Sequence, residues 1–121
     1  MSKTPEQHQL GNRGESLVAQ LLENKGYTII ARNYQKRFGE IDLIAERNDV
    51  LAFVEVKTRT HELFDLSELI TPTKQRKIIA TAKAFIAEKH YDDKTCRFDV
   101  ALLQDCNADK ISYISNAFTE E

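Results

Sequence analysis

The sequence predicts an α/β (α+β) fold with a three-layer core, in which helices flank a central mixed β-sheet. Two long stretches carry apolar residues at helical spacing, and five shorter runs are rich in β-branched and aromatic residues. They follow one another in the order α-β-β-β-α-β-β. Because 121 residues suffice for one core of this kind and not for two, we expect a single domain over residues 1–121.

The first helix is expected over residues 6–25. Thr4 and Pro5, followed by Gln7, are typical of a helix start with a capping box, and Gly26 is typical of a helix end. The apolar stripe that should face the sheet comprises Leu10, Leu17, Val18 and Leu21.

Glu15 lies at the border of this stripe, next to a glycine. Gly14 costs a helix interior about 1 kcal/mol relative to Ala, which indicates the close approach of another backbone. Glu15 is then either a carboxylate near the sheet, which needs a partner, or an exposed helix residue near Arg13. The residues alone favour neither interpretation.

Residues 27–34 are rich in Thr, Ile and Tyr and predict the first strand. A basic loop follows at residues 35–39, in which Phe38 stands beside Lys36 and Arg37. An aromatic side chain among cations can stack on a base while its neighbours contact phosphates. The other interpretation is a solvated loop without a ligand.

Two β-rich runs on either side of Asn48 and Asp49 predict a hairpin over residues 39–59. With the loop centred between these two residues, one face should be wholly apolar, because side chains alternate along a strand. The expected pairs on that face are Ala45 with Ala52, Leu43 with Val54, and Ile41 with Val56. The expected pairs on the other face are Ile44 with Phe53, Asp42 with Glu55, and Glu40 with Lys57.

The pairing of Asp42 with Glu55 is unfavourable as it stands, since like charges directly opposite each other destabilise a sheet. Three explanations are open: one carboxyl is protonated, both point into water, or a divalent cation lies between them. Lys57 adds a cation on the same face, two residues beyond Glu55.

The C-terminal half predicts a second helix and two further strands. Asp65 with Glu68 resembles a capping box for a short helical turn, and Thr71 with Pro72 begins the second long helix. Its core stripe comprises Ile78, Ile79, Ala82, Phe85 and Ile86. The strands are expected at residues 97–103 and 111–114, with a structural role for Asp99.

The start of the second long helix is a candidate phosphate contact, because a helix N-terminus favours anions. The cations and amide that we assign to it are Lys74, Gln75 and Lys77, with Arg59 from the preceding strand and Lys36 and Arg37 from the basic loop. The alternative is a solvated helix face, which is our interpretation for Arg76 and Lys83.

Composition limits the remaining classes. Lys plus Arg (17) and Asp plus Glu (19) leave a formal charge of −2, so nucleic acid would have to bind at a local basic patch. No stretch has the length and apolarity of a membrane span, and the polar residues 1–10 do not resemble a signal peptide, so a cytoplasmic protein is expected. Cys96 and Cys106 lack metal-site spacing and are expected to be reduced thiols.

Asp42 followed by Glu55-Val56-Lys57 on the next strand resembles the PD-(D/E)xK nuclease core, which restriction endonucleases and archaeal Holliday-junction resolvases share. Nearly the whole chain also resembles, in order, the small bacterial YraN-type family. The segments that carry this resemblance are GNRGE at 11–15, NY at 33–34, GEIDLI at 39–44, FVEVKTR at 53–59, KQR at 74–76 and RFDV at 97–100.

The resemblance implies a restriction-endonuclease-like fold with Glu15, Asp42, Glu55 and Lys57 as catalytic residues. The metal ligands would be Asp42, Glu55, the Val56 carbonyl and Glu15. The family's activity is itself inferred from likeness to nucleases. Junction resolvases act as dimers because they cut two strands symmetrically, so a homodimer is also implied.

The leading hypothesis is therefore an endonuclease that uses Mg²⁺ or Mn²⁺ to cleave DNA, including branched or junction DNA. Carboxylate and carbonyl oxygens suit these hard cations. Lys57 would orient the attacking water or stabilise the transition state, and Glu40 would tune Lys57 or bind a second metal. The alternative is a catalytically silent module that binds nucleic acid or a protein partner on the same fold.

Overall fold

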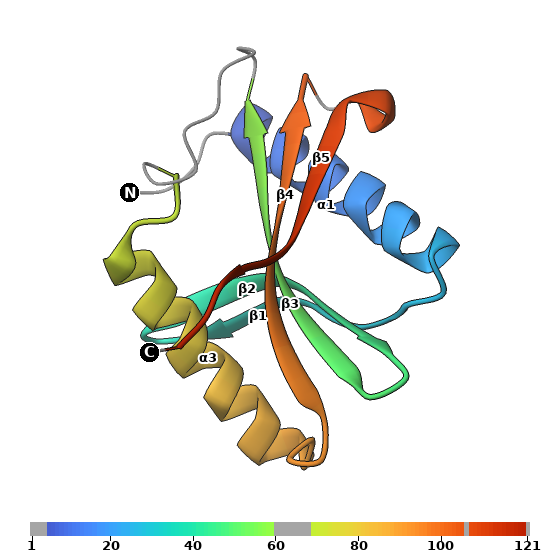
Figure 1. The fold of residues 1–121 in the computed structure, drawn as a ribbon. Coiled ribbons are helices and arrows are strands. Elements are labelled where there is room, and N and C mark those ends of the chain that lie inside the picture. Colours follow the sequence, from blue (N-terminus) through green and yellow to red (C-terminus); the bar gives the residue numbers. More distant parts are fainter. Residues whose placement is uncertain (1–4, 60–68, 106, 121) are drawn as a thin grey trace.

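A computed structural model describes residues 5–59, 69–105 and 107–120 (Figure 1). The predicted sheet and its flanking helices are present, so the fold class is confirmed. Within the described residues the elements are α1 (Pro5–Asn24), β1 (Thr28–Lys36), β2 (Gly39–Arg47), β3 (Val50–Arg59), α3 (Pro72–Lys89), β4 (Thr95–Gln104), the 3₁₀ turn η1 (Ala108–Lys110) and β5 (Ile111–Phe118). The expected start of the first helix at Thr4, the turn around Asp65 and Glu68, and Cys106 lie outside the described residues.

The five strands form one sheet in the order β1-β2-β3-β4-β5. β3 and β4 run parallel, and the other neighbouring pairs are antiparallel, so the sheet is mixed. The parallel pair requires a crossover, and α3 lies within it. In Figure 1, α1 and α3 lie on different sides of the sheet, which gives three layers.

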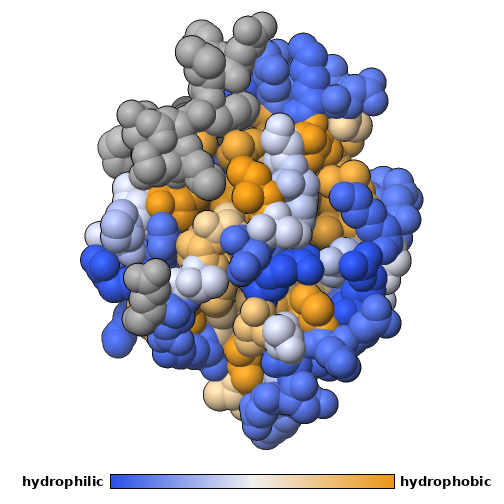
Figure 2. All heavy atoms as spheres, viewed as in Figure 1, coloured by the Kyte–Doolittle hydropathy of each residue, from blue (hydrophilic) through white to orange (hydrophobic). Residues whose placement is uncertain are grey.

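Each helix packs on its own apolar cluster. The buried residues on the α1 side are Val18, Ala19, Leu22, Tyr27, Leu43, Ala45, Ala52, Val54, Ala101 and Leu103. Those on the α3 side are Ile41, Ile44, Leu51, Phe53, Ile78, Ala82, Phe85 and Phe98. Seen from the side of α3 and β5, the surface is largely hydrophilic, with apolar atoms along its middle (Figure 2). Among the described residues, no helix is long and apolar enough to cross a membrane.

Helix α3 begins and ends at residues that favour those positions. The Thr71 side chain accepts a hydrogen bond from the Lys74 main-chain N–H, and Pro72 occupies the first turn, where its missing N–H costs nothing. His90 ends the helix in the left-handed conformation, with φ of 61°. The predicted apolar stripe faces the sheet, with Ile79 and Ile86 at its partly buried margin.

The hairpin between β2 and β3 has the predicted register from Arg47 and Val50 to Leu43 and Val54. Pairing ends there, so the three expected backbone pairs beyond it, Asp42 with Glu55, Ile41 with Val56 and Glu40 with Lys57, do not form. The side chains of Asp42 and Glu55 nevertheless meet, because the Asp42 carboxylate hydrogen-bonds the Glu55 carboxyl. Ile41 lies in the α3-side cluster, and not on the face of Leu43 as the alternation predicted. Where the pairing ends, the Asp42 carboxylate accepts the Val56 N–H.

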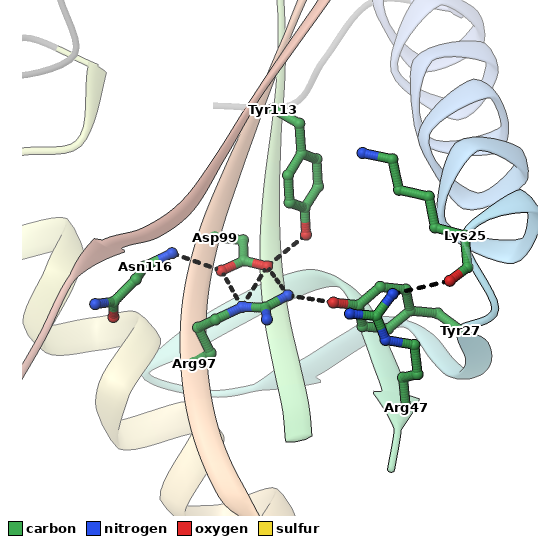
Figure 3. Close-up of polar contacts among 7 residues, drawn as sticks. All are labelled: Lys25, Tyr27, Arg47, Arg97, Asp99, Tyr113 and Asn116. Atoms are coloured by element: carbon green, nitrogen blue, oxygen red, sulfur yellow. Dashed lines mark hydrogen bonds and ion pairs between the residues drawn. The ribbon is translucent and has the colours of Figure 1, made fainter. Parts of the chain in front are cut away.

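Asp99 is the centre of a saturated polar network that joins β4 to β5 and to Tyr27, the residue before β1 (Figure 3). It is 1% exposed, and its oxygens accept hydrogen bonds from the Arg97 guanidinium, the Tyr113 hydroxyl and the Asn116 N–H. Arg97 also donates to the Tyr27 hydroxyl at 2.6 Å. A carboxylate bonded in this way stabilises the sheet, which is the structural role that the sequence predicted for Asp99.

Candidate active site

The candidate site lies where β2 and β3 stop pairing. Asp42, from β2, accepts the Val56 N–H through Oδ2 at 2.7 Å. The N–H and C=O of one strand residue point to the same side, so the Val56 carbonyl also points toward β2, beyond the last paired residues. Lys57 Nζ lies 3.8 Å from Glu55 Oε1, and both side chains are largely buried, with exposures of 21% and 16%.

Glu55 is held in its neutral form by its surroundings. Burial, and then the charge and hydrogen bond of Asp42, raise its pKa from 4.5 to about 9, against the opposing charges of Lys57 and Lys74. At pH 7 without a bound cation, Glu55 therefore keeps its proton. Of the three explanations for the carboxyl pair, the protonation of one carboxyl describes the metal-free protein. The burial of Glu55 excludes the explanation that both carboxylates point into open water.

Glu15 approaches the same pair from α1. It is 8% exposed, and its Oε1 has no hydrogen-bond partner among the described residues. Burial first, and then the charge of Asp42, raise its pKa from 4.5 to about 7, although a hydrogen bond with Asn33 and the charge of Arg32 oppose the shift. The alternative of an exposed helix residue near Arg13 is therefore wrong.

Gly14 permits this approach of α1 to the end of β3. A Cβ at Gly14 would stand 2.7 Å from Thr58 Oγ1 and 3.8 Å from Val56 Cγ1. The predicted close approach is thus present, but it is to β3 side chains and not to a backbone. As a result, β2 and β3 contribute carboxyls at the end of their pairing, and α1 adds a third carboxyl there.

Three cations gather on the α3 side of the site. The charge of Lys57 is the largest cause that lowers the pKa of Lys74, burial and Arg59 add to it, and Glu55 opposes it. Lys74 Nζ also donates to the Leu69 carbonyl at 3.1 Å, which holds it at the start of α3. Since Glu55 is protonated without metal, these cations repel one another with little compensation, and an anion would stabilise them.

The other residues predicted to contact nucleic acid differ in their exposure and in the contacts that their side chains already make within the protein. Arg37 and Lys77 are exposed. Gln75 is half-buried and donates to the Ile70 carbonyl at 3.2 Å, so its side chain holds the start of α3. Lys36 forms an ion pair with Glu88 and lies over the Tyr34 ring. Glu40 is exposed and, in place of pairing with Lys57, contributes to the raised pKa of Glu15.

The donors at this site suit a divalent cation only in part. Within residues 5–59, 69–105 and 107–120, no three His, Cys, Asp or Glu side chains converge closely enough to hold an ion as they stand. However, the buried Glu15 Oε1 has no hydrogen-bond partner among the described residues, and burial raises the pKa of Glu55. Both features are expected of carboxyls that a bound cation would stabilise. The residues therefore fit a metal held chiefly by Asp42 and Glu55.

A family model described as "Uncharacterised protein family UPF0102" matches residues 14–103, a segment that contains all four candidate catalytic residues. The chain belongs to this family. A UPF0102 protein of Prosthecochloris aestuarii is 47% identical over 97 residues, which cover 79% of this chain and 76% of that protein. A UPF0102 protein of Alkaliphilus metalliredigens is 42% identical, over 90% of this chain and 96% of that protein. A UPF0102 protein of Methylobacillus flagellatus is 40% identical, over 92% of this chain and 97% of that protein.

Proposed function

We propose that this UPF0102 protein is a metal-dependent DNA phosphodiesterase of the PD-(D/E)xK type, an endonuclease that acts on branched or junction DNA. The observation that carries the proposal is that Asp42 and Glu55 lie together in a largely buried site, where burial and the charge of Asp42 raise the pKa of Glu55. A structural sheet has no use for such a pair, because it destabilises the fold.

Asp42 and Glu55 would hold Mg²⁺ or Mn²⁺, with the Val56 carbonyl and Glu15 assisting. A bound ion of this kind lowers the pKa of its water and neutralises charge on the phosphate under attack. Binding requires that Glu55 lose its proton, so the affinity for metal should rise with pH.

The lysines would act on the substrate. Lys57 is fixed beside Glu55 and is placed to orient a water or to stabilise the charge that develops on the phosphate. Lys74 and Arg59 supply further positive charge at the start of α3, where main-chain N–H groups also favour an anion. These three cations would offset the repulsion between DNA and the carboxyls.

A catalytically silent binding module is the second candidate. It is favoured by the formal charge of −2 and by the lack of three converging metal-binding side chains in the described parts of the chain. The two candidates differ in what metal does to DNA binding. A silent module binds DNA well in EDTA, whereas the nuclease binds weakly until a divalent ion masks the carboxyls.

The test is incubation of the wild-type protein with branched, duplex and single-stranded DNA in Mg²⁺, Mn²⁺, Ca²⁺ or EDTA. Glu55→Gln should abolish cleavage, and Glu23→Gln, at an exposed position on α1, is the matched control. The proposal is supported if the wild type and Glu23→Gln cleave any of these substrates in the presence of metal and Glu55→Gln does not. Equal products from wild type and Glu55→Gln would refute it. Small-angle scattering with and without junction DNA would test whether the protein forms a homodimer. The cytoplasmic location stays a prediction.

A further inference from the structure

Phe38 is exposed at the tip of the turn between β1 and β2. It is 46% exposed, and within residues 13–59, 69–105 and 107–120 no other large apolar side chain is as open to solvent. A single exposed apolar residue is ordinary on a protein surface. Two further features distinguish Phe38. Its turn packs against α3, and a series of cations leads from the turn to the candidate site.

The turn is held against α3. A Cβ at Gly39 would stand 2.5 Å from Thr81 Oγ1 and 2.9 Å from the Lys77 carbonyl oxygen, so the backbone of the turn lies directly on the helix. At the other end of the turn, the Tyr34 hydroxyl donates to Glu88 at 2.9 Å, and Lys36 pairs with the same carboxylate. In Figure 1 the end of the β1–β2 hairpin lies beside α3. Phe38 is thus presented from a fixed support.

Positive charge leads from this turn to the candidate site. Arg37 is exposed next to Phe38, and the Lys77 backbone meets Gly39. One turn earlier in α3, Lys74 lies beside Lys57. An anionic strand lying along this line would meet a cation at each step, and the charge on Lys36 is already used by Glu88.

The spacing matches a nucleic acid strand. Phe38 precedes Asp42 by four residues, which is about 13 Å along an extended strand. A stacked strand advances about 3.4 Å per nucleotide, so this distance corresponds to roughly four nucleotides. A strand with a phosphate at the Asp42–Glu55 site would therefore carry a base within reach of Phe38.

We propose that Phe38 stacks on an unpaired base of the strand whose phosphate lies at the candidate site, while Arg37 and Lys77 contact phosphates between them. This inference rests on the proposed function, because that function places the phosphate. The substrate class is then nucleic acid with a single-stranded segment beside the cleaved bond. Bases within an intact duplex already stack on their neighbours and offer no free face.

The chain contains no Trp, so Phe38→Trp introduces a single indole at the turn, whose fluorescence can be excited apart from that of the tyrosines. Titration in Ca²⁺ with an oligothymidine strand, and separately with a blunt duplex, should quench this fluorescence only with the single strand. Asp92→Trp, at an exposed position near the far end of α3, should show no quenching with either.

Affinity gives an independent readout. Phe38→Ala and Phe38→Leu should bind the single strand roughly tenfold more weakly, and Phe38→Tyr should bind like the wild type. Affinity for the blunt duplex should not change in any variant. The inference is overturned if wild type and Phe38→Ala bind the single strand equally, or if Phe38→Ala loses as much affinity for the duplex as for the single strand. It is also overturned if the wild type does not bind the single strand at all. If the variants show that Phe38 stacks on the single strand but no DNA is cleaved with metal, the inference about Phe38 stands and only the proposed nuclease function is refuted.

Discussion

The carboxylate of Asp42 accepts the main-chain N–H of Val56 at 2.7 Å, at the point where β2 and β3 stop pairing. This one bond has two consequences. It fixes Asp42 against Glu55, and it replaces a rung of the sheet, so that the Val56 carbonyl is directed toward the same opening. The site therefore depends on an interruption of the sheet and not on an extension of it.

The raised pKa of Glu55 predicts how metal-free stability depends on pH. Between pH 4.5 and about 9, the folded protein keeps a proton that the unfolded chain releases, so the free energy of unfolding falls as pH rises through this window. Glu55→Gln should remove this loss and stabilise the protein by about 1–3 kcal/mol at pH 8, but by little at pH 4.5. Urea denaturation in EDTA at several pH values measures it. A pH-independent difference between the two proteins would show that Glu55 does not titrate in this way.

Lys57→Ala should separate metal binding from catalysis. Lys57 lies 3.8 Å from Glu55 and carries no ligand atom for a cation, so metal affinity should stay equal or rise slightly. Cleavage should be lost, because the charge that orients the water or stabilises the transition state is gone. Lys89→Ala, at the last turn of α3, is the matched control. Turnover that survives in Lys57→Ala would remove this residue from the mechanism.

Lys74→Ala should weaken DNA binding at low salt and flatten its dependence on salt. Loss of one phosphate contact should reduce the slope of log affinity against log salt by about 0.7–0.9. The control is Lys83→Ala on the same helix, since Lys83 pairs with Glu120. If both variants have the slope of the wild type, the start of α3 is a solvated face.

Gly39→Ala should destabilise the fold by about 1–3 kcal/mol, because the new methyl group would overlap both Thr81 and the Lys77 carbonyl. Thr81→Ala in the same chain should restore only part of this loss, since the Lys77 carbonyl remains in place. Thermal unfolding of the single and double variants measures both effects. Unchanged stability in Gly39→Ala would mean that the turn does not lie on α3.

Local pattern predicted most of the fold. The alternation around Asn48 and Asp49 specified the hairpin and its register as far as Leu43, because a one-residue slip would expose its apolar face. It could not predict that Ile41 changes sides, because this happens beyond Leu43, where regular pairing ends and a side chain of β2 bonds the backbone of β3. Nor could it predict the ion pair of Lys36, since its partner Glu88 lies far along the chain on α3.

The sequence predicted which residues would form the candidate site better than it predicted how they would be arranged. Spacing brought Asp42, Glu55 and Lys57 together, since they lie on adjacent strands of one hairpin. The placement of Glu15 depended on how α1 crosses the sheet, which helical periodicity alone leaves open, although Gly14 was a signal of that contact. The network of Asp99 with Tyr27 and Tyr113 joins two strands and the residue before β1, and it had no local signal beyond the buried position of the carboxylate.

Calorimetric titration of Mn²⁺ at neutral pH into wild type, Asp42→Asn and the exposed control Asp93→Asn tests the central claim most directly. Wild type and control should bind the ion and release a proton from Glu55, which the dependence of the heat on the buffer reveals. Asp42→Asn should lose this binding, although its amide oxygen can still accept the Val56 N–H. Equal binding by all three proteins, or no binding by any of them, would contradict a metal site at Asp42 and Glu55.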